Sequence, residues 1–412
     1  MEHTLLKINK ARLLDTLKVS SSIGTSENGG LNRLALSESD KKMRDTYIEW
    51  LKEAGLEVRV DDFGNIYGRR KGKRDEAPSV AFGSHLDTQP CGGKYDGILG
   101  VLTGLEVIRV LNENDIETEY PLEIVNFTNE EGARFAPPML GSGGITGDFT
   151  KDFIYNTQDD EGISYEEALK STGYMGYSQN RLSNVKNFVE LHIEQGPILH
   201  RENKTIGVVQ GIQGIDWMTV KVVGKTNHAG PTPMEDRLDA LVAASKMVVK
   251  VNEITNEITG LKTTVGKMDV KPNVTNVIPG EVEFTIDIRH EDNDLRSHAI
   301  ERLKEQLSAI ALMSKVELTI TTDWQSETTW FADDVKQAIR EAADKYGYSS
   351  MDLFSGPGHD AKYMAGIANT GMIFVPSVDG ISHNEQELTL DEDIEKGANV
   401  LLYVIQKLAG AK

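Results

Sequence analysis

The chain has 412 residues, more than one hydrophobic core usually supports, so we expect two or three domains. Its formal net charge of −20 disfavours nucleic-acid and anionic-membrane partners, since both carry negative charge. The single cysteine, Cys91, permits no intramolecular disulfide, and no stretch is long and apolar enough to span a membrane, so we expect a cytoplasmic protein.

Helical and strand patterns alternate in the first half of the chain. Ser37 and the acidic residues after it precede apolar residues at helical spacing, which predicts a helix that ends before Gly55. Short apolar runs at 79–83, 122–127 and 187–193 predict strands, and a helical pattern at 99–111 separates the first two. This order predicts right-handed crossovers and an α/β fold in which helices flank a mixed sheet with parallel members.

The middle of the chain has a different pattern. Residues 218–223 and 282–288 alternate between apolar and polar, as in strands with one exposed face, and helical patterns follow each of them. We therefore predict a small two-layer α+β domain inserted into the first domain. The expected boundaries are 213–327 for the insertion, with 1–212 and 328–412 forming the discontinuous main domain.

Side chains with metal-binding chemistry lie at or after the carboxyl ends of the predicted strands. They are His85 with Asp87, Glu130 with Glu131, and His192. Ligand sites in open α/β sheets lie at this edge, so these side chains are expected to converge. Imidazole and carboxylate groups are ligands of Zn²⁺ and Mn²⁺, and Asp87, two residues after His85, is placed to orient its ring. Asp96 and His383 offer further ligands, and glycines around Asp96 allow close approach to a metal.

The neighbouring Glu130 and Glu131 can divide two tasks. One would bind metal, and the other would serve as general base towards a water molecule whose pKa the metal lowers. Taken singly, a histidine is more often structural, and a pair of glutamates usually lies on the solvated surface. The prediction of a metal site therefore depends on all of these residues together. A serine or cysteine hydrolase is poorly supported, because Ser84 lacks a nucleophile elbow and Cys91 lacks an activating neighbour.

Six segments carry a resemblance to a known family. They are 83–90 (GSHLDTQP), 92–97 (GGKYDG), 128–135 (TNEEGARF), 192–197 (HIEQGP), 227–233 (NHAGPTP) and 355–361 (SGPGHDA). In this order they resemble the N-carbamoyl-L-amino-acid amidohydrolases and β-ureidopropionases. That group belongs to an aminoacylase-like superfamily of co-catalytic metallopeptidases, which also contains allantoate amidohydrolases. The resemblance implies a bimetal catalytic domain interrupted by a lid domain that forms a homodimer.

The resemblance also implies a role for each residue of the site. Two divalent ions (Zn, Mn, Co or Ni) would be bound by His85, Asp96, Glu131, His192 and His383, with Asp96 bridging them. Glu130 would be the general base, and Asp87 would orient His85. His359 competes for the last ligand position, and we prefer His383 because the family's terminal ligand has a similar sequence setting.

The implied substrate is a small molecule with a carboxylate and a ureido group. Asn276 and Arg289 would bind the carboxylate, Gln195 the ureido group, Gly358 would offer a backbone donor, and His228 would stabilise the oxyanion, often from the neighbouring subunit. The expected reaction is hydrolysis of the carbamoyl amide of an N-carbamoyl-L-amino acid or N-carbamoyl-β-alanine. Allantoate hydrolysis, a related aminoacylase or dipeptidase activity, and a scaffold without activity are the alternatives.

Overall fold

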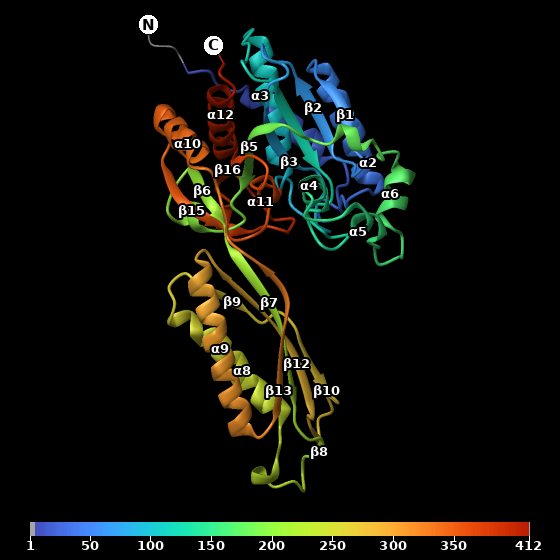
Figure 1. Cartoon of the computed structure of the whole chain (residues 1–412), viewed down its shortest axis with the longest axis vertical. Coiled ribbons are helices and arrows are strands. Elements are labelled where there is room, and N and C mark those ends of the chain that lie inside the picture. Colours follow the sequence, from blue (N-terminus) through green and yellow to red (C-terminus); the bar gives the residue numbers. More distant parts are fainter. Residues whose placement is uncertain (1–4, 412) are drawn as a thin grey trace. The chain divides into compact units, whose positions relative to one another are not determined.

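The structure is a computed structural model that describes residues 5–411. The chain forms two compact units, drawn in Figure 1. The first unit contains the residues up to Gln210 and those from Trp330 onward, and the second contains Gly211–Thr329. These limits lie within a few residues of the boundaries expected at 212/213 and 327/328. Among the described residues, no helix combines the length and apolar character needed to cross a membrane.

The first unit is built on a mixed sheet whose central strands are parallel. Strands β4, β3, β5 and β16 are neighbours and run in the same direction, whereas β2 and β6 pair antiparallel at the two sides. This arrangement confirms the predicted fold class. The strands are β1 (Glu57–Val60), β2 (Ile66–Arg70), β3 (Ser79–His85), β4 (Leu122–Phe127), β5 (Val185–Ile193), β6 (Ile206–Ile212), β14 (Thr329–Trp330), β15 (Ser350–Ser355) and β16 (Asn369–Val375).

Helix α3 (Ile98–Glu113) lies at the centre of the first unit. Nearly all its side chains are buried, because it packs against β3, β4 and β5 and also contacts α1 and α12. A helix enclosed in this way can be apolar on every side. The other helices of this unit are α1 (Lys10–Ser21), α2 (Glu38–Glu53), α4 (Leu140–Thr146), α5 (Lys151–Asn156), α6 (Tyr165–Thr172), α7 (Ile198–Arg201), α10 (Asp333–Tyr346), α11 (Ala361–Met364) and α12 (Asp391–Leu408), with 3₁₀ turns η1 (Ser178–Asn180) and η4 (Val378–Gly380).

The predicted elements of the first unit are present, and several others were not predicted. Ser37 caps α2 by accepting a hydrogen bond from the Asp40 backbone N–H, as its position suggested. The sequence patterns did not predict helices α1, α5 and α6 or strands β6 and β15. Helix α4 follows Met139, which has a left-handed backbone conformation, and three of its seven residues are glycine. Glycine disfavours helices, so no helix propensity indicated this one.

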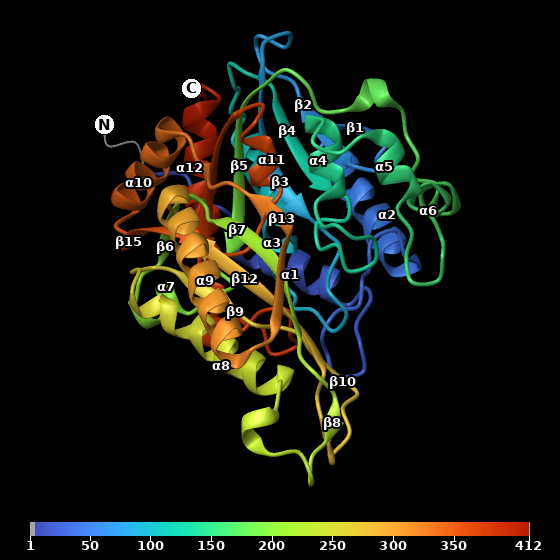
Figure 2. The ribbon, with the colours of Figure 1, turned by 60° about the horizontal axis from the view of Figure 1, so that its bottom comes forward.

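The second unit is a two-layer α+β structure. Strands β7, β9, β10, β12 and β13 form an antiparallel five-stranded sheet, and α8 and α9 lie side by side on it (Figure 2). The apolar residues of β12 alternate with half-buried polar ones, as predicted. Its elements are β7 (Gly214–Val223), β8 (Asn227–His228), η2 (Met234–Asp236), α8 (Ala240–Glu253), η3 (Ile254–Asn256), β9 (Lys262–Thr264), β10 (Met268–Lys271), β11 (Val277–Ile278), β12 (Glu281–His290), α9 (Asn293–Ser314) and β13 (Glu317–Ser326).

Candidate metal centre

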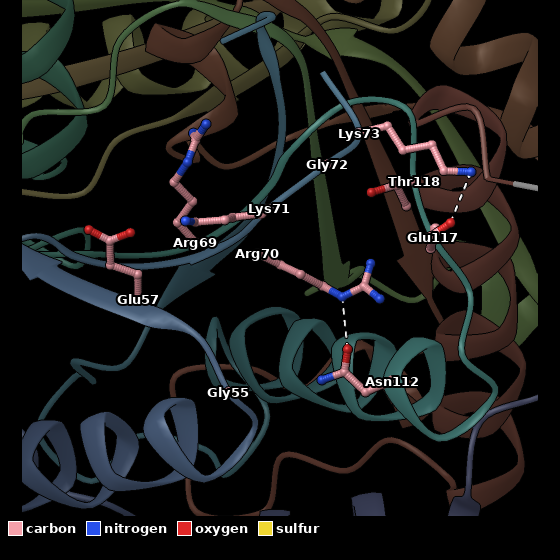
Figure 3. A pocket seen from close by; sticks show the side chains of 10 residues that line it. All are labelled: Gly55, Glu57, Arg69, Arg70, Lys71, Gly72, Lys73, Asn112, Glu117 and Thr118. Carbon is pink, nitrogen blue, oxygen red and sulfur yellow. Dashed lines mark hydrogen bonds and ion pairs between the residues drawn. The ribbon is translucent and has the colours of Figure 1, made fainter. Parts of the chain in front are cut away.

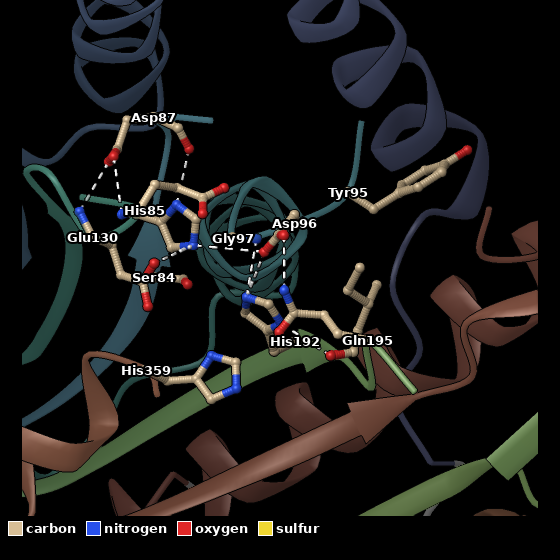
Figure 4. A network of polar contacts seen from close by, with 12 residues as sticks. Ser84, His85, Asp87, Tyr95, Asp96, Gly97, Glu130, His192, Gln195 and His359 are labelled. Carbon is tan, nitrogen blue, oxygen red and sulfur yellow. Dashed lines mark hydrogen bonds and ion pairs between the residues drawn. The ribbon is translucent and has the colours of Figure 1, made fainter. Parts of the chain in front are cut away.

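Polar side chains converge where the central parallel strands of the first unit end. His85 is the last residue of β3, and it pairs with Phe127, the last residue of β4. Glu130 follows β4 by three residues, and His192 lies near the end of β5, which also pairs with β3. Parallel pairing thus brings together residues far apart in sequence, as Figure 4 shows.

Asp96 joins the two histidines in a first cluster. One of its carboxylate oxygens lies 3.1 Å from His192 Nε2 and 3.8 Å from His85 Nε2. All three side chains are buried, and one atom of each lies within 4.8 Å of the others. Gly97, which follows Asp96, has φ +66°, and a Cβ added there would lie 2.3 Å from the His85 ring. Only a glycine at this position permits the approach.

Both histidines present the nitrogen that a metal would need. His85 Nδ1 lies 2.9 Å from the Asp87 carbonyl oxygen, and His192 Nδ1 lies 2.9 Å from the Ile193 carbonyl oxygen. His85 Nδ1 therefore donates its proton to the carbonyl, which leaves the His85 Nε2 lone pair facing the cluster. His192 Nε2 also faces the cluster, but it lies 3.1 Å from both the Asp96 carboxylate and the Gly97 backbone nitrogen. Although burial lowers the pKa of His192, its hydrogen bond with Asp96 raises that pKa to about 9. His85 Nε2 is buried and has no hydrogen-bond partner among the described residues, and burial lowers the pKa of His85 to about 4. The ring is thus neutral and able to bind a cation.

A second cluster shares Asp96 with the first. The other Asp96 oxygen lies 3.3 Å from His383 Nε2, and Glu131 lies 3.4 Å from the same nitrogen. Asp96 therefore faces His192 with one oxygen and His383 with the other, as a bridging carboxylate would. Burial alone would raise the pKa of Asp96, but hydrogen bonds with His192 and His383 hold this pKa well below its ordinary value.

Glu130 lies beside the first cluster without belonging to the second. Its Oε2 is 3.5 Å from His85 Nε2, and only 7% of the residue is exposed. Burial and the nearby carboxylates of Asp360, Glu131 and Asp96 raise the pKa of Glu130 well above its ordinary value. Buried carboxylates at this density repel one another unless cations compensate them. Together with the histidine Nε2 atoms that face them, these carboxylates form a donor set that fits two divalent cations.

Asp87 supports this centre in a different manner from the one expected. Its backbone carbonyl accepts the hydrogen bond from His85, whereas its carboxylate accepts the backbone N–H groups of Glu130, at 3.3 Å, and Glu131, at 3.2 Å. The carboxylate therefore positions the loop after β4, and the orientation of His85 depends on the main chain. The sequence spacing suggested contact between the side chains because β-strand geometry was assumed to continue through Asp87, but β3 ends at His85.

Two predicted substrate residues lie in the first unit. Gln195 donates from Nε2 to the Asp96 carboxylate at 2.8 Å, so its amide reaches the candidate metal centre. Gly358 precedes His359 in the loop between β15 and α11. His359 does not join the His383 cluster: its Nε2 lies 3.0 Å from Ser355 Oγ, and its ring groups with His192 and Glu190. The geometry thus places His383, and not His359, beside Asp96 and Glu131.

The other three predicted substrate residues lie in the second unit, in two places. His228 and Asn276 are adjacent, because β8 pairs with β11 and Ala229 donates its backbone N–H to the Asn276 carbonyl at 2.9 Å. Arg289 lies near the other end of β12 and makes a two-point contact with Asp287, at 2.9 and 2.7 Å. The second unit therefore brings His228 and Asn276 together and does not bring Arg289 to them.

Two buried carboxylates near the centre were not predicted. Glu387 accepts hydrogen bonds from the backbone N–H groups of Tyr95 and Asp96 and from the Ser382 hydroxyl. Glu190 accepts from Ser84 Oγ at 2.6 Å and from the Ala361 backbone N–H at 3.1 Å. Glu190 precedes His192 by two residues on β5, so strand alternation could have placed it on the same side. No local pattern points to Glu387, whose partners are distant in sequence.

Comparison with known proteins adds independent findings. The model of peptidase family M20/M25/M40 matches residues 81–407. An N-carbamoyl-L-amino-acid amidohydrolase of Rhizobium meliloti is 40% identical, covering 98% of this chain and 97% of the relative. An allantoate amidohydrolase of Bacillus subtilis is 34% identical over 99% of this chain and 100% of its own length. A crystal structure of a hydantoinase/carbamoylase family amidase from Burkholderia multivorans has a TM-score of 0.94 and 46% identity, covering 98% of both chains.

Proposed function

Because the chain belongs to peptidase family M20/M25/M40, we propose that it is a metal-dependent amidohydrolase acting on N-carbamoyl-L-amino acids or N-carbamoyl-β-alanine. Water would cleave the carbamoyl amide to give the amino acid, ammonia and carbon dioxide. The observation that carries this proposal is the full-length similarity to a relative named for this reaction. The two clusters that share Asp96 support it, because they supply the donors that such chemistry requires.

We assign His85, Asp96 and His192 to one divalent ion and Asp96, Glu131 and His383 to the other. When bound, these ions would polarise the substrate carbonyl and lower the pKa of the attacking water. The mixture of imidazole and carboxylate accepts Zn, Mn, Co or Ni, so availability decides which metal is used.

Glu130 is the proposed general base and proton donor. Its carboxylate would take a proton from the attacking water and deliver it to the leaving nitrogen. The Asp87 carboxylate holds the backbone of Glu130 and Glu131, which keeps the base and a ligand in fixed relation. Burial of Glu130 favours a proton on its carboxylate, as the delivery step requires.

The substrate would be held by groups from both units. Gln195 is assigned to the ureido group, since its amide already reaches Asp96, and Gly358 to a backbone hydrogen bond. Asn276 and Arg289 are assigned to the carboxylate and His228 to the oxyanion. His228 and Asn276 lie at one end of the second unit and Arg289 lies near the other end, so we assign His228 and Asn276 of one copy, and Arg289 of another copy, to the same small substrate. We therefore propose that the protein is a homodimer formed through the second unit. We also propose that it is located in the cytoplasm, as its single cysteine suggests.

The second candidate is allantoate, because an allantoate amidohydrolase is also similar over the full length. Its lower identity, 34% against 40%, places it behind the carbamoyl amino acids. A scaffold without activity is disfavoured because all five proposed ligands and the base are present.

Ammonia release tests the proposal directly. The purified protein, loaded with Mn²⁺ or Zn²⁺, would be assayed with several N-carbamoyl-L-amino acids, N-carbamoyl-β-alanine and allantoate. We expect kcat/KM to be highest for a carbamoyl amino acid and to disappear on chelation. The Glu130→Gln variant should lose about 10²–10⁴-fold in kcat while its metal content is unchanged, since its side chain keeps its size but cannot accept the proton. Highest activity on allantoate, or full activity in Glu130→Gln, would overturn the corresponding assignment.

A further inference from the structure

A basic pocket of about 510 Å³ lies in the first unit, away from the candidate metal centre. Strand β2 and the loop after it supply Arg69, Arg70, Lys71 and Lys73, while Thr118 and Asn112 face them from other segments (Figure 3). We propose that this pocket binds the phosphate group of a small metabolite or free inorganic phosphate.

Strand register separates this pocket from the metal centre. Arg70 at the end of β2 pairs antiparallel with Leu122, the first residue of β4. Glu130 follows the opposite end of β4, which is about 17 Å away along a strand of this length. The pocket and the metal centre therefore lie at opposite ends of β4, so they are two separate binding sites.

Two of the four cations have no carboxylate partner. Arg69 is engaged by Glu123 and Asp75, and Lys73 by Glu117 at 3.0 Å. Among the described residues, no carboxylate lies within 4.0 Å of the Arg70 guanidinium, and the Lys71 ammonium has no hydrogen bond or ion pair. Arg70 instead donates to the Asn112 side chain at 2.8 Å and to the Ile116 carbonyl at 2.6 Å, which fixes its direction.

Thr118 gives a second, independent indication of a ligand. The residue lines the pocket and is 1% exposed, yet its hydroxyl has no hydrogen-bond partner among the described residues. A buried hydroxyl without a partner destabilises the folded state unless a ligand or water satisfies it. An anionic oxygen at this position would accept a hydrogen bond from the hydroxyl, whereas an apolar group would leave the hydroxyl without a partner.

The loop that carries Lys71 is held in place by the backbone. Lys73 and Arg74 donate their N–H groups to the Thr118 and Glu119 carbonyls, both at 2.9 Å. Gly72 lies so close to the next segment that an added Cβ would be 2.4 Å from the Tyr120 carbonyl carbon. The pocket is therefore preformed, which lowers the entropic cost of binding.

The charge of the pocket selects among anions. Four basic and two acidic side chains line it, and one of the acids, Glu117, is already paired. A phosphate group carries close to two negative charges at pH 7 and has several acceptor oxygens, which suits Arg70, Lys71 and the Thr118 hydroxyl. Polyanions such as nucleic acid are disfavoured by the net charge of −20.

Calorimetric titration of the metal-loaded protein with inorganic phosphate, and separately with glycerol phosphate, tests the proposal. We expect Lys71→Glu to weaken binding about tenfold or more, because it replaces an unpaired cation with an anion. Arg70→Gln should weaken binding similarly, and Glu57→Gln should strengthen it by removing the exposed carboxylate of the pocket. Arg74→Glu is the matched control, since Arg74 is on the same loop but does not line the pocket.

The comparison of Lys71→Glu with Arg74→Glu, made with both ligands, separates the possible outcomes. Phosphate held elsewhere, for example at the metals, would bind Lys71→Glu and Arg74→Glu equally and would overturn the proposal. No binding of either ligand at millimolar concentration would also overturn it. Selective loss in Lys71→Glu supports the pocket, and the tighter of the two ligands identifies whether the phosphate is free or esterified. Lys71 is exposed and has no hydrogen bond or ion pair among the described residues, so we expect its replacement to leave folding intact.

Discussion

At the scale of single residues, the candidate centre depends on buried carboxylates that do not belong to the proposed ligand set. Glu387 receives backbone N–H groups from the Asp96 loop, at 3.1 and 3.2 Å, and the Ser382 hydroxyl, at 2.9 Å, from the loop that carries His383. One carboxylate thus ties together two loops that are nearly 300 residues apart in sequence. Gly93 allows this, because a Cβ there would lie 1.8 Å from Glu387 Oε1.

We predict that Glu387→Ala weakens metal binding by about 10–100-fold, because the two loops lose their common acceptor. Glu387→Gln should lose less, since its amide oxygen still accepts the two backbone N–H groups. Affinity would be measured by competition with a chelator of known strength, alongside the melting temperature of the metal-free protein. Glu385→Ala is the control, because the Glu385 side chain has no hydrogen bond or ion pair among the described residues. Unchanged affinity in Glu387→Ala would contradict this positioning role.

Much of the site at this scale follows from residue type and spacing, and some does not. His85, Glu130 and His192 were expected to converge because they follow parallel strands, and the structure brings them together. The role of the Asp87 carboxylate was not predictable, because it depends on where β3 ends and on the path of the next loop. Long-range acceptors such as Glu387 leave no periodic pattern in the sequence.

At the scale of elements, α3 links the sheet to the candidate centre. The helix begins directly after Asp96 and Gly97, so its position against β5 decides where Asp96 lies. Gly100 sits at the contact: an added Cβ would lie 2.4 Å from the Leu191 carbonyl oxygen and 3.0 Å from Ser84 Cβ. The apolar pattern at 99–111 predicted the helix. The close approach of the helix to β5 depends on the absence of a side chain at Gly100, which the apolar periodicity does not indicate.

We predict that Gly100→Ala destabilises the protein by about 1–3 kcal/mol, because the strand or the helix must move. Helix propensity alone predicts the opposite sign, since alanine is favoured over glycine by about 1 kcal/mol inside a helix. Gly104→Ala on the same helix meets only side chains, the nearest at 3.1 Å, and should cost clearly less. Thermal and urea unfolding of both variants would measure the difference. Equal stability of the two variants would show that the close contact at Gly100 does not control the packing.

At the scale of the whole molecule, the inserted unit separates the residues assigned to one substrate. Strand β12 pairs antiparallel with β7, residue 281 with residue 223 and residue 289 with residue 215. Nearly the whole length of β12 therefore separates residue 223 from residue 289. His228 lies just beyond the first end, and Arg289 lies at the second, which places them roughly 25 Å apart at about 3.3 Å per residue. The sequence named both residues through resemblance and gave no measure of this separation.

A small substrate spans far less than this distance, so His228 and Arg289 of one copy do not both contact it. We predict that His228→Ala and Arg289→Ala each abolish turnover as homodimers, whereas dimers that combine one of each recover up to half of the wild-type activity per dimer. In such a dimer one site has an intact Arg289 from its own chain and an intact His228 from the partner. Differently tagged chains, refolded or co-expressed and isolated by both tags, would be assayed for ammonia release. If mixed dimers stay inactive, both residues serve the same chain's site, and the assignment of His228 to the partner is wrong.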